Sequence, residues 1–186
     1  DMLMQTIVDL VPVATDMPAE AAEDDGNAIE VAYDPNGTTA AFVFKTISDQ
    51  YGKYSMIKVI RGKVTGDMSL YNMTTGNTEK LGRLYTMKGK KSEETKEICC
   101  GDIGAIGKMD KVKTGDTLCD ADRVVKLPAP VFPKPSLFMA VTVAKKGDEG
   151  KISSALARLM EEDPTLSYEN NAETHQQIIG GLGEQH

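Results

Sequence analysis

The sequence predicts an antiparallel β-barrel domain followed by a partial α+β ferredoxin-like domain of βαββ order. Three features carry this prediction. Residues 29–126 show a hydrophobic alternation of period two, and turn signals recur within them at the spacing of about 8–12 residues that is typical of barrels. After a proline-rich segment the pattern changes to strand, helix, strand, strand. The domain boundaries that these changes indicate are 1–27, 28–127 and 128–186.

The first segment is predicted to combine a short helix with a linker. Leu3, Ile7 and Leu10 share one helical face, and Pro12 ends the helix. The remainder, including the acidic run 20–25, is predicted to be a linker. Because an isolated helix of about ten residues is marginal in water, we expect this helix to pack either on the barrel or on a domain outside this chain.

The second segment contains the strands of the predicted barrel. Residues 41–47 and 54–61 are rich in β-branched and aromatic side chains, and the link 49–53 between them is typical of a hairpin turn. Further strands are predicted at 68–72, 79–88, 103–108 and 123–126. Closing such short strands into a barrel removes the exposed edges at which open sheets aggregate.

The third segment begins with a stiff connector that carries four prolines, Pro128, Pro130, Pro133 and Pro135. The elements predicted after it are a strand at 137–144, a helix between its cap Asp148 and Pro164, and a hairpin of strands 166–170 and 175–179 around Asn170-Asn171. Glycines at 180, 181 and 183 lead into the predicted first turn of another helix. The α+β sandwich is therefore incomplete, and the sequence looks truncated.

The sequence holds few side chains that are suited to catalysis or metal binding. His175 and His186 belong to no metal-binding or nucleophile motif. Cys99, Cys100 and Cys119 are an odd number and two are adjacent, which favours free thiols in a reducing cytosol. No apolar run approaches the roughly 20 residues that span a bilayer, and no signal peptide is recognisable. We expect a cytoplasmic protein, with no membrane partner and no metal or cofactor in this chain.

The glycine-rich stretch 101–107 invites comparison with phosphate-binding loops. Its spacing is GxxGxxG where a dinucleotide-binding loop has GxGxxG, and no Lys-Ser/Thr pair follows as in a P-loop. Because the stretch lies among predicted strands, a barrel strand whose glycines permit curvature is the favoured interpretation. This chain by itself is not expected to bind or hydrolyse a nucleotide.

Charge is unevenly distributed along a chain whose formal net charge is −7. Residues 1–35 hold nine acidic and no basic side chains, whereas residues 45–91 hold ten basic and three acidic ones. Basic side chains on a barrel wall can neutralise the phosphates of a nucleic acid, although a solvated face is the alternative. The RNA-binding candidates are Lys58, Arg61, Lys63, Arg83, Lys88, Lys90 and Lys91. Four tyrosines either stack on bases or belong to the core, namely Tyr51, Tyr54, Tyr71 and Tyr85.

The helix of the third segment ends in three carboxylates, Glu161, Glu162 and Asp163. Negative charge near a helix C-terminus opposes the helix dipole, at a cost of about 0.3–1 kcal/mol for each exposed side chain. A cation or a contact with another domain would offset this cost, so the three residues are interdomain candidates. Simple solvation of the carboxylates is the alternative.

Several strings of residues occur in the order of a known family. The barrel segment contains AFVFK (41–45), VIRGKVTGD (59–67), KLGRL (80–84), GDI (101–103) and TGDTLCD (114–120). The third segment contains LARLMEEDPT (156–165) and GGLGEQH (180–186). In this order the strings resemble the second and third domains of the translation elongation factor G family. Residues 2–18 are similar to the last helix of the family's GTPase domain and the exit from it.

The resemblance implies a ribosome-dependent GTPase that acts in translation elongation and translocation. Its nucleotide site, with GTP and Mg²⁺, would lie upstream of residue 1, and further domains would follow residue 186. The resemblance also implies that the barrel contacts ribosomal RNA of the small subunit, that small-subunit proteins are further partners, and that the third domain relays the GTPase state. Two other functions stay open, a ribosomal-protection (tetracycline-resistance) type GTPase and a stand-alone RNA-binding β-barrel module.

One departure from the family concerns the string GEQH at 183–186, where the family usually has Gly-Glu-Leu-His. This difference indicates an elongation factor G-like paralogue of the principal translocase. The sequence alone leaves open which step of translation such a paralogue serves.

Overall fold

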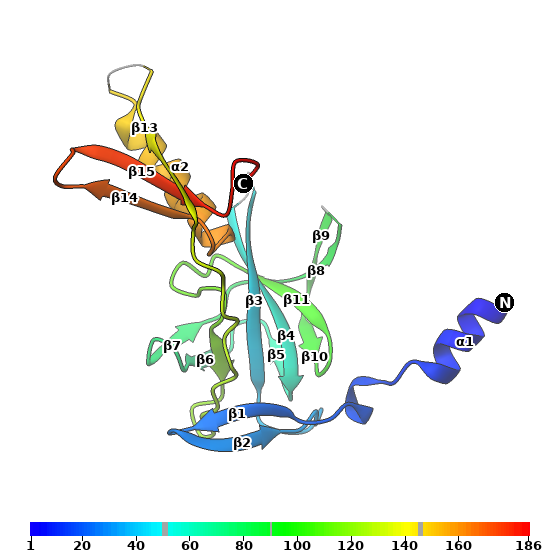
Figure 1. Ribbon diagram of the computed structural model, residues 1–186. Coiled ribbons are helices and arrows are strands. Elements are labelled where there is room, and N and C mark those ends of the chain that lie inside the picture. Colours follow the sequence, from blue (N-terminus) through cyan, green and yellow to red (C-terminus); the bar gives the residue numbers. More distant parts are fainter. Residues whose placement is uncertain (50–51, 90, 145–146) are drawn as a thin grey trace.

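The computed structural model describes residues 1–49, 52–89, 91–144 and 147–186, and it shows a barrel, a smaller C-terminal unit and a projecting N-terminal helix (Figure 1). Helix α1 (Met2–Leu10) forms where the apolar spacing predicts it, and a single 3₁₀ turn, η1 (Ala14–Asp16), follows. No residue of α1 is buried, and Figure 1 shows it well away from the barrel. No helix in the described part of the chain is long and apolar enough to cross a membrane.

The acidic run after α1 forms a β-hairpin, so the prediction of a linker is wrong for this part. Its strands are β1 (Glu20–Asp24) and β2 (Asn27–Val31). Asp25 and Gly26 connect them with φ angles of 47° and 81°. Two such left-handed residues make a type I′ turn, for which Asp-Gly is a strong sequence signal. Ala22 and Val31 are buried in a cluster with barrel residues, so the hairpin closes one end of the barrel.

The wall of the barrel is an antiparallel sheet in the order β7-β6-β12-β3-β4-β11-β8-β9, as the predicted fold class requires. Its strands are β3 (Ala40–Asp49), β4 (Gly52–Arg61), β6 (Ser69–Asn72), β7 (Asn77–Lys80), β8 (Leu84–Lys88), β9 (Lys91–Thr95), β11 (Ile103–Gly107) and β12 (Thr117–Cys119). A separate ribbon of β5 (Lys63–Thr65) and β10 (Glu97–Cys99) packs beside the sheet.

Apolar side chains from both the sheet and the ribbon fill the interior of the barrel. Ile57 on β4, Ile106 on β11 and Leu118 on β12 are fully buried in one cluster. Gly104 faces Ile98 so closely that an added Cβ would clash with the Ile98 Cδ1 atom. The glycine-rich stretch is therefore a strand whose glycines permit close packing, and the prediction of a barrel strand there is confirmed.

Two strand predictions are wrong in detail. The predicted strand 79–88 is two strands, β7 and β8, because Leu81 turns into the core between them and its amide bonds to the Met68 carbonyl. The predicted strand 123–126 is irregular except for one bridge, in which Lys126 and Glu23 exchange two backbone hydrogen bonds of 2.8 Å. In both places tertiary contacts, and not the local alternation of side chains, decide where pairing stops.

The C-terminal unit follows the predicted order of strand, helix, strand, strand. Its elements are β13 (Leu137–Val141), α2 (Glu149–Glu162), β14 (Ser167–Asn171) and β15 (Gln176–Gly181). The sheet is antiparallel in the order β13-β15-β14, and the hairpin turn occupies 172–175. Asp148 sits at the N-cap of α2 as predicted, but its carboxylate makes no cap hydrogen bond and pairs with Lys151 at 2.7 Å.

Candidate nucleic-acid interface

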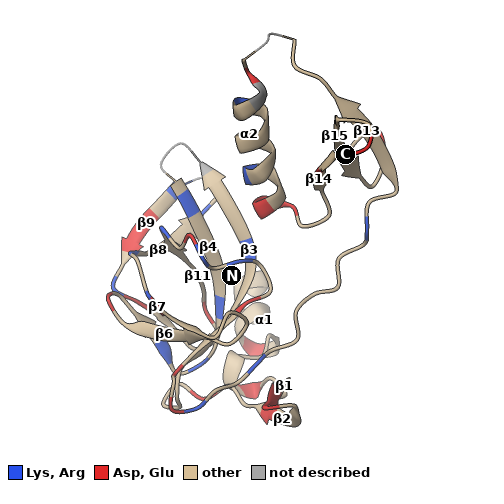
Figure 2. Cartoon of the chain, turned by 90° about the vertical axis from the view of Figure 1, so that its left-hand side faces the viewer, with Lys and Arg blue, Asp and Glu red and all other residues tan. Residues whose placement is uncertain are grey.

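The basic residues that the sequence singles out do not converge into one patch. Their positions are on β4 for Lys58 and Arg61, on β5 for Lys63, between β7 and β8 for Arg83, at the end of β8 for Lys88 and at the start of β9 for Lys91. Lys90 lies outside the described residues. Figure 2 shows basic and acidic residues interspersed along the strands and loops of the barrel.

Five of these candidates pair with carboxylates. The pairs are Lys58–Glu20 at 3.6 Å, Arg61–Asp34 at 3.8 Å, Lys63–Glu97 at 3.1 Å, Arg83–Glu94 at 3.3 Å and Lys88–Glu93 at 2.8 Å. All five acidic partners lie outside the range 45–91, on which the prediction of a basic stretch rests. The folded barrel therefore neutralises much of the charge excess that this range shows in the sequence.

Lys58 takes part in a three-residue network that fastens the β1–β2 hairpin to the barrel. Its Nζ donates to the Tyr33 hydroxyl at 2.6 Å, and that hydroxyl donates to Glu20 Oε1 at 2.5 Å. The hydrogen bond to Tyr33 raises the pKa of Lys58, whereas burial and the hydrogen bond to Glu20 raise the pKa of Tyr33. Both shifts keep the lysine charged and the tyrosine protonated, so the network holds over the physiological pH range.

Arg61 is packed into the barrel wall. Its side chain is 18% exposed and lies so close to Gly37 that an added Cβ there would clash with the Arg61 Nε atom. The Nε atom is buried and has no hydrogen-bond partner among the described residues. This placement gives Arg61 a structural role in holding the loop that contains Asp34 and Gly37.

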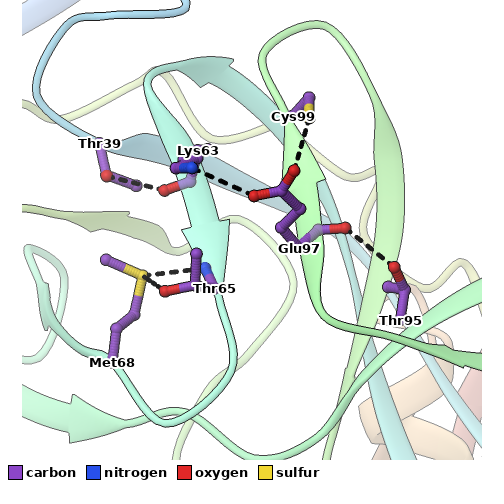
Figure 3. A network of polar contacts seen from close by, with 7 residues as sticks. All are labelled: Thr39, Lys63, Thr65, Met68, Thr95, Glu97 and Cys99. Carbon is purple, nitrogen blue, oxygen red and sulfur yellow. Dashed lines mark hydrogen bonds and ion pairs between the residues drawn. The ribbon is translucent and has the colours of Figure 1, made fainter.

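Lys63 belongs to a polar network on the β5–β10 ribbon (Figure 3). Its Nζ donates to Glu97 Oε2 at 3.1 Å, and its carbonyl accepts the Thr39 hydroxyl at 3.0 Å. Cys99 Sγ approaches the other oxygen of Glu97 at 4.0 Å. The lysine side chain remains more than half exposed, so phosphate can still reach it.

A group of exposed lysines outside the predicted stretch forms no ion pair within the described part of the chain. These are Lys108, Lys111 and Lys113, which lie in the loop between β11 and β12. Lys91, at the end of the predicted stretch, is also exposed and likewise forms no ion pair with a described residue. The spacing K-x-x-K-x-K is visible in the sequence of this loop. These lysines are not among the candidates selected from the sequence, because the count of basic residues covers only 45–91. Because they have no carboxylate to displace, these four side chains can meet phosphates directly.

The tyrosines lie where the core interpretation places them. Tyr54 is buried and contacts Tyr85 edge to face, with ring centroids 5.4 Å apart and an interplanar angle of 83°. Tyr71 packs on the cluster that contains Cys119. Tyr51 lies outside the described residues. A base could therefore stack on Tyr54 only if the Tyr54–Tyr85 contact were broken.

The acidic end of α2 divides its contacts between the two units. Glu161 Oε2 lies 3.1 Å from Lys53 Nζ on β4, and Glu162 Oε1 accepts the Ser48 amide of β3 at 2.8 Å. Asp163 turns back into its own unit and accepts the Thr165 amide at 2.9 Å. The hydroxyl of Thr165 and then the ring of His186, 2.7 Å away, lower the pKa of Asp163.

The thiols show no features of catalytic nucleophiles. Cys99 is exposed, Cys100 is half-buried and Cys119 is buried, and all three are free. Burial is the main cause that raises the pKa of both Cys100 and Cys119, so these thiols stay protonated near neutral pH. No group of three or more His, Cys, Asp and Glu side chains among the described residues is placed to hold a metal ion.

Comparison with known proteins identifies both units. The family model for elongation factor G domain 2 matches residues 38–121, and the model for elongation factor G domain III matches residues 132–186. Elongation factor G proteins of Ureaplasma parvum serovar 3 and Ureaplasma urealyticum serovar 10 are each 38% identical to this chain over 99% of its length. The alignment covers 27% of each of them, so the chain spans about a quarter of the length of these relatives.

A solved structure has the same arrangement of elements. The crystal structure of a Thermus thermophilus protein matches with a TM-score of 0.76 and 25% sequence identity. The match covers 98% of this chain and 26% of that chain. The similarity therefore extends over both units together, including their relative placement.

Proposed function

Because the chain belongs to the elongation factor G family, whose second and third domains it contains, we propose that it is the part of a ribosome-dependent translational GTPase through which that enzyme contacts the ribosome during elongation. The barrel would bind small-subunit ribosomal RNA, and the C-terminal unit would pass the state of the nucleotide site to the rest of the protein. In this proposal GTP and Mg²⁺ are bound by another domain of the parent protein.

The observation that carries the proposal is the pair of family matches. Both occur in the family's order on one chain, and they are separated only by ten residues, 122–131, that include part of the proline connector. A barrel alone would be consistent with many nucleic-acid-binding proteins. The second match favours an elongation factor over a stand-alone RNA-binding module.

The charges on the barrel divide the basic residues into two groups with different proposed roles. Four of the exposed lysines for which the described part of the chain shows no ion pair, Lys91, Lys108, Lys111 and Lys113, would contact phosphates directly. Lys63, Arg83 and Lys88 are well exposed, and their surface ion pairs are each worth about 0–1 kcal/mol, so they can exchange a carboxylate for a phosphate at little cost. Lys58 and Arg61 would mainly maintain the barrel.

The test compares the parent protein with the 186-residue chain. We expect the parent protein to sediment with ribosomes in the presence of a non-hydrolysable GTP analogue and much less with GDP. The chain alone should bind ribosomal RNA only weakly, and its affinity should fall as salt rises. Tight binding of the chain to naked RNA, with no effect of nucleotide on the parent, would favour the stand-alone module. Release of bound tetracycline without translocation would favour the ribosomal-protection type.

A variant series tests the proposed phosphate contacts. Replacing Lys108, Lys111 and Lys113 together by alanine should weaken ribosome binding and reduce the slope of log affinity against log salt by about 2–3, since each lost phosphate contact contributes roughly 0.7–0.9. Lys134→Ala, in the proline connector, is the matched control and should leave the slope unchanged. An unchanged slope in the triple variant would remove this loop from the interface.

A further inference from the structure

We propose that the acidic end of α2 is a two-point polar latch that sets the orientation of the C-terminal unit on the barrel and that can open. The latch consists of Glu161 and Glu162 on α2, with Lys53 and Ser48 on the barrel. The latch involves neither a ribosome nor a nucleotide, so its test does not depend on whether the proposed function is correct.

The two barrel groups of the latch are neighbours in the β3–β4 hairpin. Ser48 and Lys53 face each other in the strand register, so the helix end meets a backbone donor and a cation at one point of a rigid ladder. The Lys53 side chain is only 12% exposed, and its Nζ also lies 3.5 Å from the Asp110 carbonyl. A partly buried cation held in this way gains more from a carboxylate than a lysine in free solution does.

The connection and the packing between the two units leave room for the C-terminal unit to move. The chain between the units, residues 128–136, forms no helix or strand and runs as a long extended segment (Figure 1). A cavity of about 470 Å³ lies between α2 and the barrel beside the latch, with Thr46, Lys53 and Lys113 on one side and Ala157, Met160 and Tyr168 on the other. Because this space is not filled by side chains, the polar contacts at the helix end contribute directly to the docking.

The latch also explains the unusual charge at the end of α2. Carboxylates in the last turn of a helix oppose its dipole, and α2 has no basic residue in that turn. The barrel supplies a lysine and a backbone amide where those carboxylates point, and Figure 2 shows the acidic helix end facing the barrel. The helix is therefore less stable alone than when docked, which couples its last turn to the barrel.

The test measures the distance between the two units in the 186-residue chain by electron-spin resonance. One spin label is placed on the exposed native Cys99 and the other on the exposed position Asn170→Cys, in a background carrying Cys100→Ser. Lys53→Glu should increase the population with a long separation about two- to five-fold, the range expected for loss of one ion pair. Glu161→Gln should act in the same direction without altering the barrel.

The controls separate the latch from general changes in charge or folding. Adding Glu161→Lys to Lys53→Glu restores opposite charges and should restore the short distance. Glu169→Lys, an exposed glutamate on β14, should have no effect, whereas 1 M salt should act as Lys53→Glu does. The proposal is overturned if the distances do not respond to Lys53→Glu and to salt, or if the charge-reversed pair fails to restore them.

Discussion

The barrel and the C-terminal unit have equally regular secondary structure but very different interiors. In the barrel, Ile57 and Leu118 are 0% exposed. In the described part of residues 132–186, Gly180 is the only residue that counts as buried, and Phe138 and Met139 are 56% and 60% exposed. The difference shows that an amphipathic pattern suffices to form a strand or a helix, whereas a core requires enough elements to enclose it.

The enclosure has a geometric origin. A curved eight-stranded sheet with an extra ribbon and a hairpin across one end surrounds its apolar side chains on all sides. Three strands and one helix form only two layers, and the apolar side chains of β13 remain in contact with water. We expect the barrel to supply most of the free energy of unfolding, and the C-terminal unit to open on its own.

The largest effect should come from matched truncations in the two units. Leu118→Ala removes a fully buried side chain and should lower the free energy of unfolding by about 2–5 kcal/mol. Phe138→Ala removes a larger but half-exposed side chain and should cost less than about 1 kcal/mol. Urea unfolding followed by circular dichroism measures both. Equal losses would mean that the C-terminal unit has an enclosed core in solution.

A smaller contrast is expected between two arginines of the barrel. Arg61→Ala should destabilise the barrel by about 1–3 kcal/mol, because it removes a largely buried side chain that is packed on Gly37 and pairs with Asp34. Arg83→Ala removes a side chain that is 74% exposed and should cost less than about 1 kcal/mol. The midpoint of urea unfolding distinguishes the two variants. A large loss in Arg83→Ala alone would reverse the assignment of their roles.

The smallest effect should be a decrease in the stability of the C-terminal unit at acid pH. The pKa of Asp163 is lower in the folded chain than its ordinary value of about 3.9, so the stability that its ionised form contributes is present above about pH 4 and is lost as pH falls through the folded pKa. The Thr165 amide proton, bonded to Asp163 Oδ1, reports the titration by NMR. The midpoint of this titration should lie below about pH 3.9, and the titration should be absent in Asp163→Asn. A midpoint above that value would contradict the hydrogen bonds of Asp163 to Thr165 and His186.

Local signals in the sequence predict most of the elements. The β3–β4 hairpin, strand β11 and helix α2 lie where period, turn residues and proline predict them. The β14–β15 hairpin is also present, but its turn lies at 172–175, and the predicted turn residues Asn170 and Asn171 pair within β14. The β1–β2 hairpin carries an equally local signal, Asp25-Gly26, but its acidic composition favours a linker. The split of 79–88 into β7 and β8 follows from the burial of Leu81, which depends on strands that are distant in the sequence.

The sequence by itself determined the order of the elements, the two units and the family, because periodicity, turn chemistry and motif strings are properties of neighbouring residues. Only the tertiary structure decided which charged side chains form ion pairs. It paired Lys58 with Glu20 and Arg61 with Asp34, and it brought the end of α2 to Lys53. Electrostatic interaction depends on distance in space, so a charge count along the chain cannot tell a free basic surface from a neutralised one.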